Sequence, residues 1–189
     1  MELTDEETIA NVCKGATEEY ALLVKKYERT IYNLMYRFTD NDQEAADLTQ
    51  EVFVQSFSKL HTLDLKKGYF SWLYTIAMNK GKDWKRALRN RACHTVWTEE
   101  HHCKEKDLFH DLSVPEHAMQ KQQDFELLHG ALMSLPHPIR EILLLRYKYD
   151  RPVKEIADIF SLSESATKMR IKRSLEQLQK VLQDTSIRS

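Results

Sequence analysis

The sequence YFSWLYTIAMNKGKDWKRALRNR, residues 69–91, decides how the chain folds. Aromatic side chains crowd its first half, and residues 80–91 hold six Lys and Arg against a single Asp. At helical spacing it carries an apolar stripe and a separate polar stripe, namely Phe70, Leu73, Ala77, Trp84 and Leu88, and Asn79, Asp83, Arg86 and Asn90. We therefore expect a helix that packs on a core along one side. Its basic side suits either a polyanionic partner or plain solvation.

The composition favours an all-α protein. Helix-forming residues dominate, whereas 4 Gly and 4 Pro in 189 residues leave few turns for a sheet-rich fold. The net charge of −1 argues against a non-specific, histone-like DNA binder. Acidic charge gathers at residues 40–51, and basic charge at 80–91 and 168–173. This uneven placement predicts at least two kinds of partner surface.

The expected location is the cytoplasm, without membrane insertion. No stretch approaches the roughly 18 to 20 apolar residues of a membrane span. The acidic start, MELTDEETIA, lacks the pattern of a signal peptide. Three cysteines cannot all pair within the chain, which disfavours a secreted disulfide framework. One of them, Cys13, is expected to be a buried thiol.

The first half of the chain predicts a four-helix bundle over residues 1–92. Thr4 and Glu7 have capping-box spacing, which opens a short helix that ends near Gly15. A second helix covers residues 16–38, and a third begins at Asn41 or Asp42. The inward side of the third helix is expected to hold Ala45, Leu48, Val52, Phe53 and Phe57. Residues 60–68 are predicted to form a loop before the basic helix.

Periodicity is lost over residues 93–115, which we expect to link the bundle to a second domain at 116–189. This linker gathers five potential soft ligands: Cys93, His94, His101, His102 and Cys103. Zinc takes four such ligands, but the spacing matches no familiar zinc motif. A metal site, a Cys93–Cys103 redox switch and an ordinary polar linker all stay open, and we predict no resident metal or cofactor.

The second domain is predicted to be helical and to contain a helix-turn-helix. Its first helix has Met119, Phe125, Leu128, Leu132 and Leu135 at core spacing. A short helix at 153–160, a break at 161–163 and a long basic helix from Glu164 to about residue 183 give the motif's outline. Lys168, Arg170, Lys172 and Arg173 lie largely outward on the long helix. That helix either reads a DNA major groove or forms a helical hairpin with a basic exposed face.

The combination resembles a known family. DQEAADLTQEVF (42–53) followed by FSWLYTIAMNKGKDWKR (70–86) resembles the second conserved region of bacterial sigma factors of the extracytoplasmic-function (ECF) group. LPHPIREILLLRYKYDRPVKEIADIFSLSESATKMRIKRSLEQL (135–178) is similar to the fourth region of that group. The resemblance implies a two-domain subunit, without an active site, that directs core RNA polymerase to promoters and aids strand opening.

The resemblance also implies three sets of site residues. Those that dock on core polymerase are Asp47, Gln50 and Glu51, on a helix side that has no offsetting Lys or Arg. Those that bind the melted −10 strand are Asn79, Lys80, Lys82, Asp83, Lys85, Arg86 and Arg89. Those that bind the −35 duplex are Ser165, Ala166, Lys168, Met169, Arg170, Lys172 and Arg173. Backbone amides at Ser165 and Ala166 are expected to hold a phosphate.

The −35 segment departs from the family pattern at the turn, where Ser161 replaces the usual glycine. Ser165-Ala166 also replaces a Gly-Thr pair, and Thr167 stands where valine is common. A non-glycine residue with positive φ costs about 1 kcal/mol. The −35 sequence that this chain reads is therefore left open.

The resemblance also implies a protein partner, and two other classes of function compete with the sigma-factor interpretation. The family implies an anti-sigma partner that covers both domains. The alternative is a stand-alone helix-turn-helix regulator, which explains residues 136–178 but leaves the acidic and aromatic-basic helices without a role. A metalloenzyme that uses the linker cluster is a third class, but the sequence contains no nucleophile–base motif, glycine-rich phosphate loop or HExxH.

Overall fold

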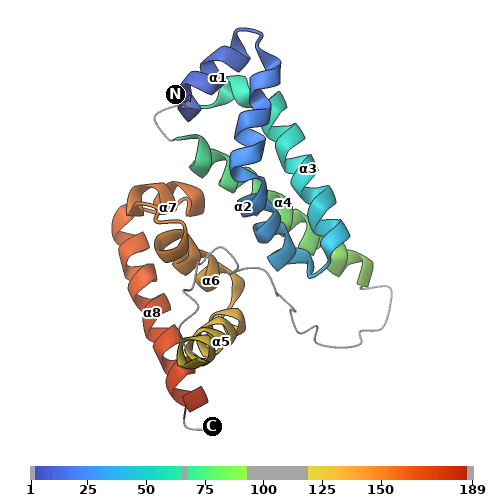
Figure 1. The fold of residues 1–189 in the computed structure, drawn as a ribbon. Coiled ribbons are helices and arrows are strands. Elements are labelled where there is room, and N and C mark those ends of the chain that lie inside the picture. Colours follow the sequence, from blue (N-terminus) through green and yellow to red (C-terminus); the bar gives the residue numbers. More distant parts are fainter. Residues whose placement is uncertain (1–2, 65–67, 93–118, 187–189) are drawn as a thin grey trace. The chain divides into compact units, whose positions relative to one another are not determined.

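The computed structural model describes residues 3–64, 68–92 and 119–186, and every regular element within those ranges is helical (Figure 1). This confirms the all-α prediction. The chain divides into two compact units, Met1–Glu105 and Lys106–Ser189. The predicted linker, residues 93–115, lies outside the described residues, as does its Cys and His cluster.

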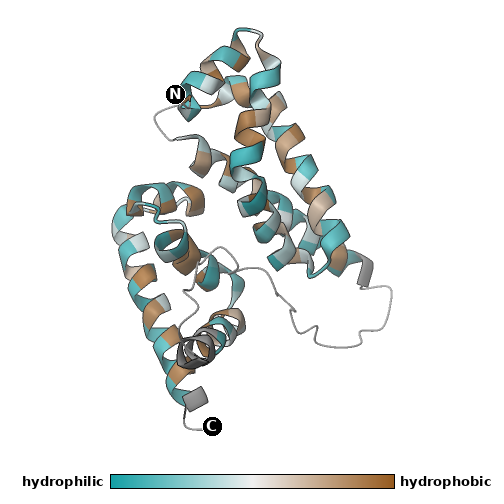
Figure 2. Cartoon of the chain, in the orientation of Figure 1, coloured by the Kyte–Doolittle hydropathy of each residue, from teal (hydrophilic) through white to brown (hydrophobic). Residues whose placement is uncertain are grey.

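The N-terminal unit packs one long helix against two others. Helix α2 contacts both α3 and α4, and α3 also contacts α4. The elements in order are α1 (Asp5–Cys13), η1 (Thr17–Glu19), α2 (Tyr20–Thr39), α3 (Asp42–Ser58), η2 (Leu60–Thr62) and α4 (Tyr69–Ala92). Brown apolar and teal polar residues recur along these helices, as amphipathic helices require (Figure 2).

The predicted helix starts are confirmed by their caps. Thr4 accepts a hydrogen bond from the Glu7 amide, and the Glu7 carboxylate accepts one from the Thr4 amide at 2.8 Å. Asn41 Oδ1 accepts from the Glu44 amide at 3.0 Å and begins α3. Each cap satisfies an amide that the first turn of a helix otherwise leaves unpaired.

The core of this unit forms where three helices meet. Its fully buried side chains include Leu23, Ile31, Leu34, Met35, Ala45, Val52, Leu73, Tyr74 and Ala77. Gly81 of α4 lies against the ring of buried Phe38 from α2. A side chain at position 81 would meet that ring, so glycine allows α2 and α4 to approach closely.

Four predictions of buried side chains in this unit were wrong. Phe57 and Leu88, expected to face the core, are 41% and 48% exposed. Trp84 is half-buried because its indole lies toward α3, where Nε1 donates to Glu44 Oε2 at 3.1 Å. Cys13 is exposed at the end of α1. Helical periodicity locates a stripe, but it does not show where neighbouring helices stop covering it.

The C-terminal unit contains the predicted helix-turn-helix. Leu132, Leu135, Leu143 and Leu144 form its buried cluster, with Leu175, Leu178 and Val181 of the last helix packed against it. Leu128 is 43% exposed, which corrects its predicted place in the core. The elements in order are α5 (Met119–Ser134), α6 (His137–Leu143), the π-helix η4 (Leu144–Lys148), α7 (Val153–Phe160) and α8 (Glu164–Ser186).

Candidate docking and nucleic-acid interfaces

The outer side of α3 carries the three residues predicted to dock on polymerase. Asp47, Gln50 and Glu51 are placed there, with Asp47 and Glu51 exposed and Leu48 and Val52 beside them buried. Val54 continues the same side one turn later and is 70% exposed. The result is an acidic surface with an apolar end, held on a helix whose opposite side is fixed in the core. Sequence reasoning did not pick out Val54.

The polar side of α4 carries the residues predicted to bind the −10 strand. Asn79, Lys82, Asp83, Arg86 and Arg89 are exposed, whereas Lys80 and Lys85 are half-buried. Asp83 Oδ1 lies 3.1 Å from Arg86 Nη1, so this carboxylate orients the Arg86 guanidinium. Lys85 Nζ lies 5.3 Å from the centre of the Phe38 ring, a cation–π geometry that holds the lysine stem against the core.

Trp72 of α4 is half-buried. Its ring lies 6.0 Å from that of Tyr69, at the start of α4. Tyr69 is itself buried and donates a hydrogen bond to the Tyr20 hydroxyl at 3.4 Å. Tyr20 donates to the carbonyl of Phe53 at 2.9 Å. This network fixes the first turn of α4 to α2 and α3.

The acidic surface of α3 and the basic side of α4 meet at one ion pair. Lys80 Nζ lies 2.5 Å from Glu51 Oε2. The prediction that the acidic side has no offsetting cation is therefore wrong at Glu51. The two residues are far apart in sequence, so only the packing of α3 on α4 brings them together.

The turn of the helix-turn-helix has the strained residue that the sequence predicted. Ser161 adopts a left-handed conformation with φ 54°, at the C-terminal end of α7. Ser163 Oγ accepts from the Ala166 amide at 3.2 Å, as an N-cap does. The Ala166 amide therefore already has one acceptor within the chain, and its expected role in holding a phosphate stays a prediction. Buried Thr167 also fits this turn, because its hydroxyl donates to the Ser163 carbonyl at 3.0 Å.

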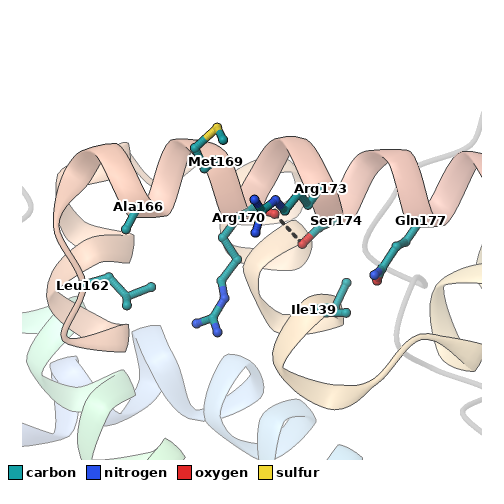
Figure 3. A pocket seen from close by; sticks show the side chains of 8 residues that line it. All are labelled: Ile139, Leu162, Ala166, Met169, Arg170, Arg173, Ser174 and Gln177. Atoms are coloured by element: carbon teal, nitrogen blue, oxygen red, sulfur yellow. Dashed lines mark hydrogen bonds between the residues drawn. The ribbon is translucent and has the colours of Figure 1, made fainter.

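The exposed side of α8 contains all seven residues predicted to bind the −35 element, but they do not all point the same way. In Figure 3 the Met169 side chain points away from α6, whereas Arg170 points toward the hollow beside it. That hollow has a volume of about 460 Å³, and Ile139, Leu162 and Ala166 form part of its apolar lining.

The described residues contain no cluster of three or more His, Cys, Asp or Glu that could hold a metal ion.

Comparison with known proteins decides the family. The Sigma-70 region 2 model matches residues 23–91, and the Sigma-70, region 4 model matches residues 131–180. The chain is 30% identical over 181 residues to the RNA polymerase sigma-H factor of Pseudomonas aeruginosa, an alignment that covers 95% of this chain and 94% of that protein. The chain belongs to the ECF group of the sigma-70 family. This sigma factor is also 28% identical over 188 residues to the ECF RNA polymerase sigma factor SigW of Bacillus subtilis, covering 97% and 100% of the two chains.

Solved structures show the same fold. The sigma factor RpoE of Bartonella quintana, in complex with the anti-sigma factor NepR, aligns over 88% of this chain and 98% of its own, with a TM-score of 0.65 and 18% identity. CnrH, in complex with the cytosolic domain of CnrY, aligns over 94% and 96%, with a TM-score of 0.64 and 19% identity. In the described part of this sigma factor, no helix is long and apolar enough to cross a membrane.

Proposed function

We propose that this sigma factor recruits core RNA polymerase through α3, reads the −35 duplex with α8 and binds the melted −10 strand with α4. The observation that carries the proposal is the presence of both sigma-70 regions, in order, each presenting exposed charged residues on a helix packed against a core. In this assignment residues 1–92 and 116–189 are the two working domains.

The docking step uses the acidic surface of α3. Asp47 and Glu51 offer two exposed carboxylates one helical turn apart, and Gln50 adds an amide between them. Complementary charge speeds association and fixes orientation, so the matching surface of polymerase is expected to be basic. Val54 adds apolar area that becomes buried when the surfaces meet.

Strand capture uses the exposed side of α4. Asn79 can both donate to and accept from a base edge, while Lys82, Arg86 and Arg89 provide charge for phosphates. Holding an unstacked base costs a few kcal/mol, which contacts to the sugar-phosphate backbone of the strand must offset. On α8, Lys168, Lys172 and Arg173 provide phosphate or base contacts, and exposed Met169 provides an apolar contact such as a thymine methyl accepts.

The remaining partners follow the family. The neighbour RpoE was solved with the anti-sigma factor NepR, and we propose an anti-sigma partner for this chain too. The proposed location is the cytoplasm, where core polymerase works. The proposed role is that of an initiation factor, with catalysis left to polymerase.

The test is reconstituted transcription on genomic DNA, with core polymerase alone and with this chain added. The proposal expects new transcripts that share start-site motifs, and permanganate footprints should show their −10 regions melted. Asn79→Ala should lower strand opening while leaving core binding intact. Lys25→Ala, at an exposed α2 position outside the three sets, is the control. An absence of new transcripts, combined with specific duplex binding by the chain alone, would favour the stand-alone regulator.

A further inference from the structure

We propose that the Glu51–Lys80 ion pair makes docking and strand binding depend on each other. In the free chain Glu51 is ion-paired with Lys80. When a basic group of the partner pairs with Glu51 instead, Lys80 becomes available to bind a nucleic-acid phosphate. This inference rests on the proposed function, because Glu51 belongs to the docking surface of α3 and Lys80 to the α4 residues predicted to bind the −10 strand.

The geometry places one charge between two surfaces. Lys80 Nζ and Glu51 Oε2 are 2.5 Å apart, and the side chains are 31% and 56% exposed respectively. Water and a partner can therefore reach the carboxylate, while the lysine lies closer to the core. The pair joins α3 to α4, so it differs from the Asp83–Arg86 pair, which stays within one turn of α4.

The pair is weak enough to exchange. Exposed ion pairs contribute about 0.2 to 1 kcal/mol, and less at high salt. A lysine whose charge is already met by a carboxylate at contact distance attracts a phosphate less strongly than a free lysine. When a partner's arginine or lysine engages Glu51, the same carboxylate no longer offsets Lys80 as fully. Linkage then requires that bound strand strengthens docking by the same factor as docking strengthens strand binding.

Asp47 provides an internal comparison. It lies one turn before Glu51 on the same exposed side of α3, and the described residues include no ion-pair partner for it. Removing its charge changes the general field of the surface without freeing a lysine. On α4, Lys82 likewise is exposed and has no ion-pair partner among the described residues.

The experiment measures binding of the full chain to a fluorescein-labelled oligothymidylate by anisotropy at low salt, without polymerase. Glu51→Gln should raise the affinity about 1.4- to 5-fold, the range that corresponds to an exposed ion pair. Asp47→Asn should give a smaller gain. In a Lys80→Met background, Glu51→Gln should raise the affinity for the oligothymidylate no more than Asp47→Asn does. Melting curves must show that the variants fold as the wild type does.

Docking gives the reciprocal test. Without DNA, Lys80→Met should tighten binding to core polymerase by the same factor of about 1.4 to 5, because docking no longer competes with the ion pair. Lys82→Met should change that affinity less. Equal gains from Glu51→Gln and Asp47→Asn, or a gain that persists in the Lys80→Met background, would overturn the linkage in favour of a general charge effect. Failure of the wild-type chain to bind core polymerase at all would instead refute the proposed function.

Discussion

Replacing Gly81 by Ala is expected to destabilise the N-terminal unit, although alanine is the better helix former. A Cβ at position 81 would lie 2.3 Å from Cδ2 of Phe38, and 2.5 and 2.6 Å from two further ring carbons. Ordinary contact begins at 3.4 Å, so the ring would have to withdraw by about 1 Å. Phe38 is only 6% exposed, and its ring lies beneath Lys85, so it has little space to move.

The two opposing effects can be compared. Overpacking a tight core costs about 1 to 3 kcal/mol. Gly→Ala in a helix returns about 0.8 to 1 kcal/mol. The expected net loss is therefore up to about 2 kcal/mol of unfolding free energy. Gly130 of α5 is the matched control, because it is exposed and a Cβ there would meet nothing within 4 Å. Gly130→Ala is expected to stabilise its own unit by about 0.5 to 1 kcal/mol.

Urea unfolding can follow the two units separately. Trp72 and Trp84 both lie on α4, so in a Trp97→Phe background tryptophan fluorescence reports on the N-terminal unit, while far-ultraviolet circular dichroism reports on both units. Gly81→Ala should lower the fluorescence midpoint, and Gly130→Ala should leave it in place. A Phe38→Leu background should reduce the penalty of Gly81→Ala, because the ring that the new methyl group meets is gone. A midpoint that rises in the Gly81→Ala variant would refute the steric account of the α2–α4 crossing.

Three further predictions concern single contacts. Burial raises the pKa of Tyr69 far above its ordinary value. The stability that this group contributes is therefore fully present below about pH 10 and is lost as pH rises beyond it. In the Tyr69→Phe variant the urea midpoint should depend less on pH between about pH 8 and about pH 11. Ser163→Ala removes the cap on α8 and should cost about 0.5 to 2 kcal/mol, seen in circular dichroism without a shift in tryptophan fluorescence. Exposed Cys13 should react with a thiol reagent in the native chain as fast as in urea, and strong native protection would contradict its position.

Local chemistry made much of this fold predictable. Thr4 with Glu7, Asn41 and Ser163 each cap a helix where the sequence placed one. Ser161 takes the positive φ that its place in the turn required. These features depend on residues within four positions of one another, so the local sequence is enough to predict them.

Tertiary packing set the limits of prediction. Phe57, Leu88 and Leu128 keep helical spacing with buried neighbours, yet each is largely exposed, and Phe57 is so even though its ring lies 5.0 Å from that of Tyr20. The Glu51–Lys80 pair depends on how α3 packs against α4. The three predicted sets of site residues stay predictions about binding, although the structure places them on the outer sides of three helices.

Binding to purified core RNA polymerase tests the central claim most directly. Fluorescence anisotropy with labelled wild-type chain should show tight, saturable binding, and Asp47→Arg with Glu51→Arg should weaken it by at least about tenfold, or about 1.4 kcal/mol. Glu18→Arg reverses an exposed charge on η1 and serves as the control. The predicted result is that the wild-type chain and the Glu18→Arg control bind tightly, whereas the double charge reversal loses tight binding. Equal binding by all three proteins would contradict docking through α3, and no binding by the wild-type chain would contradict the sigma assignment itself.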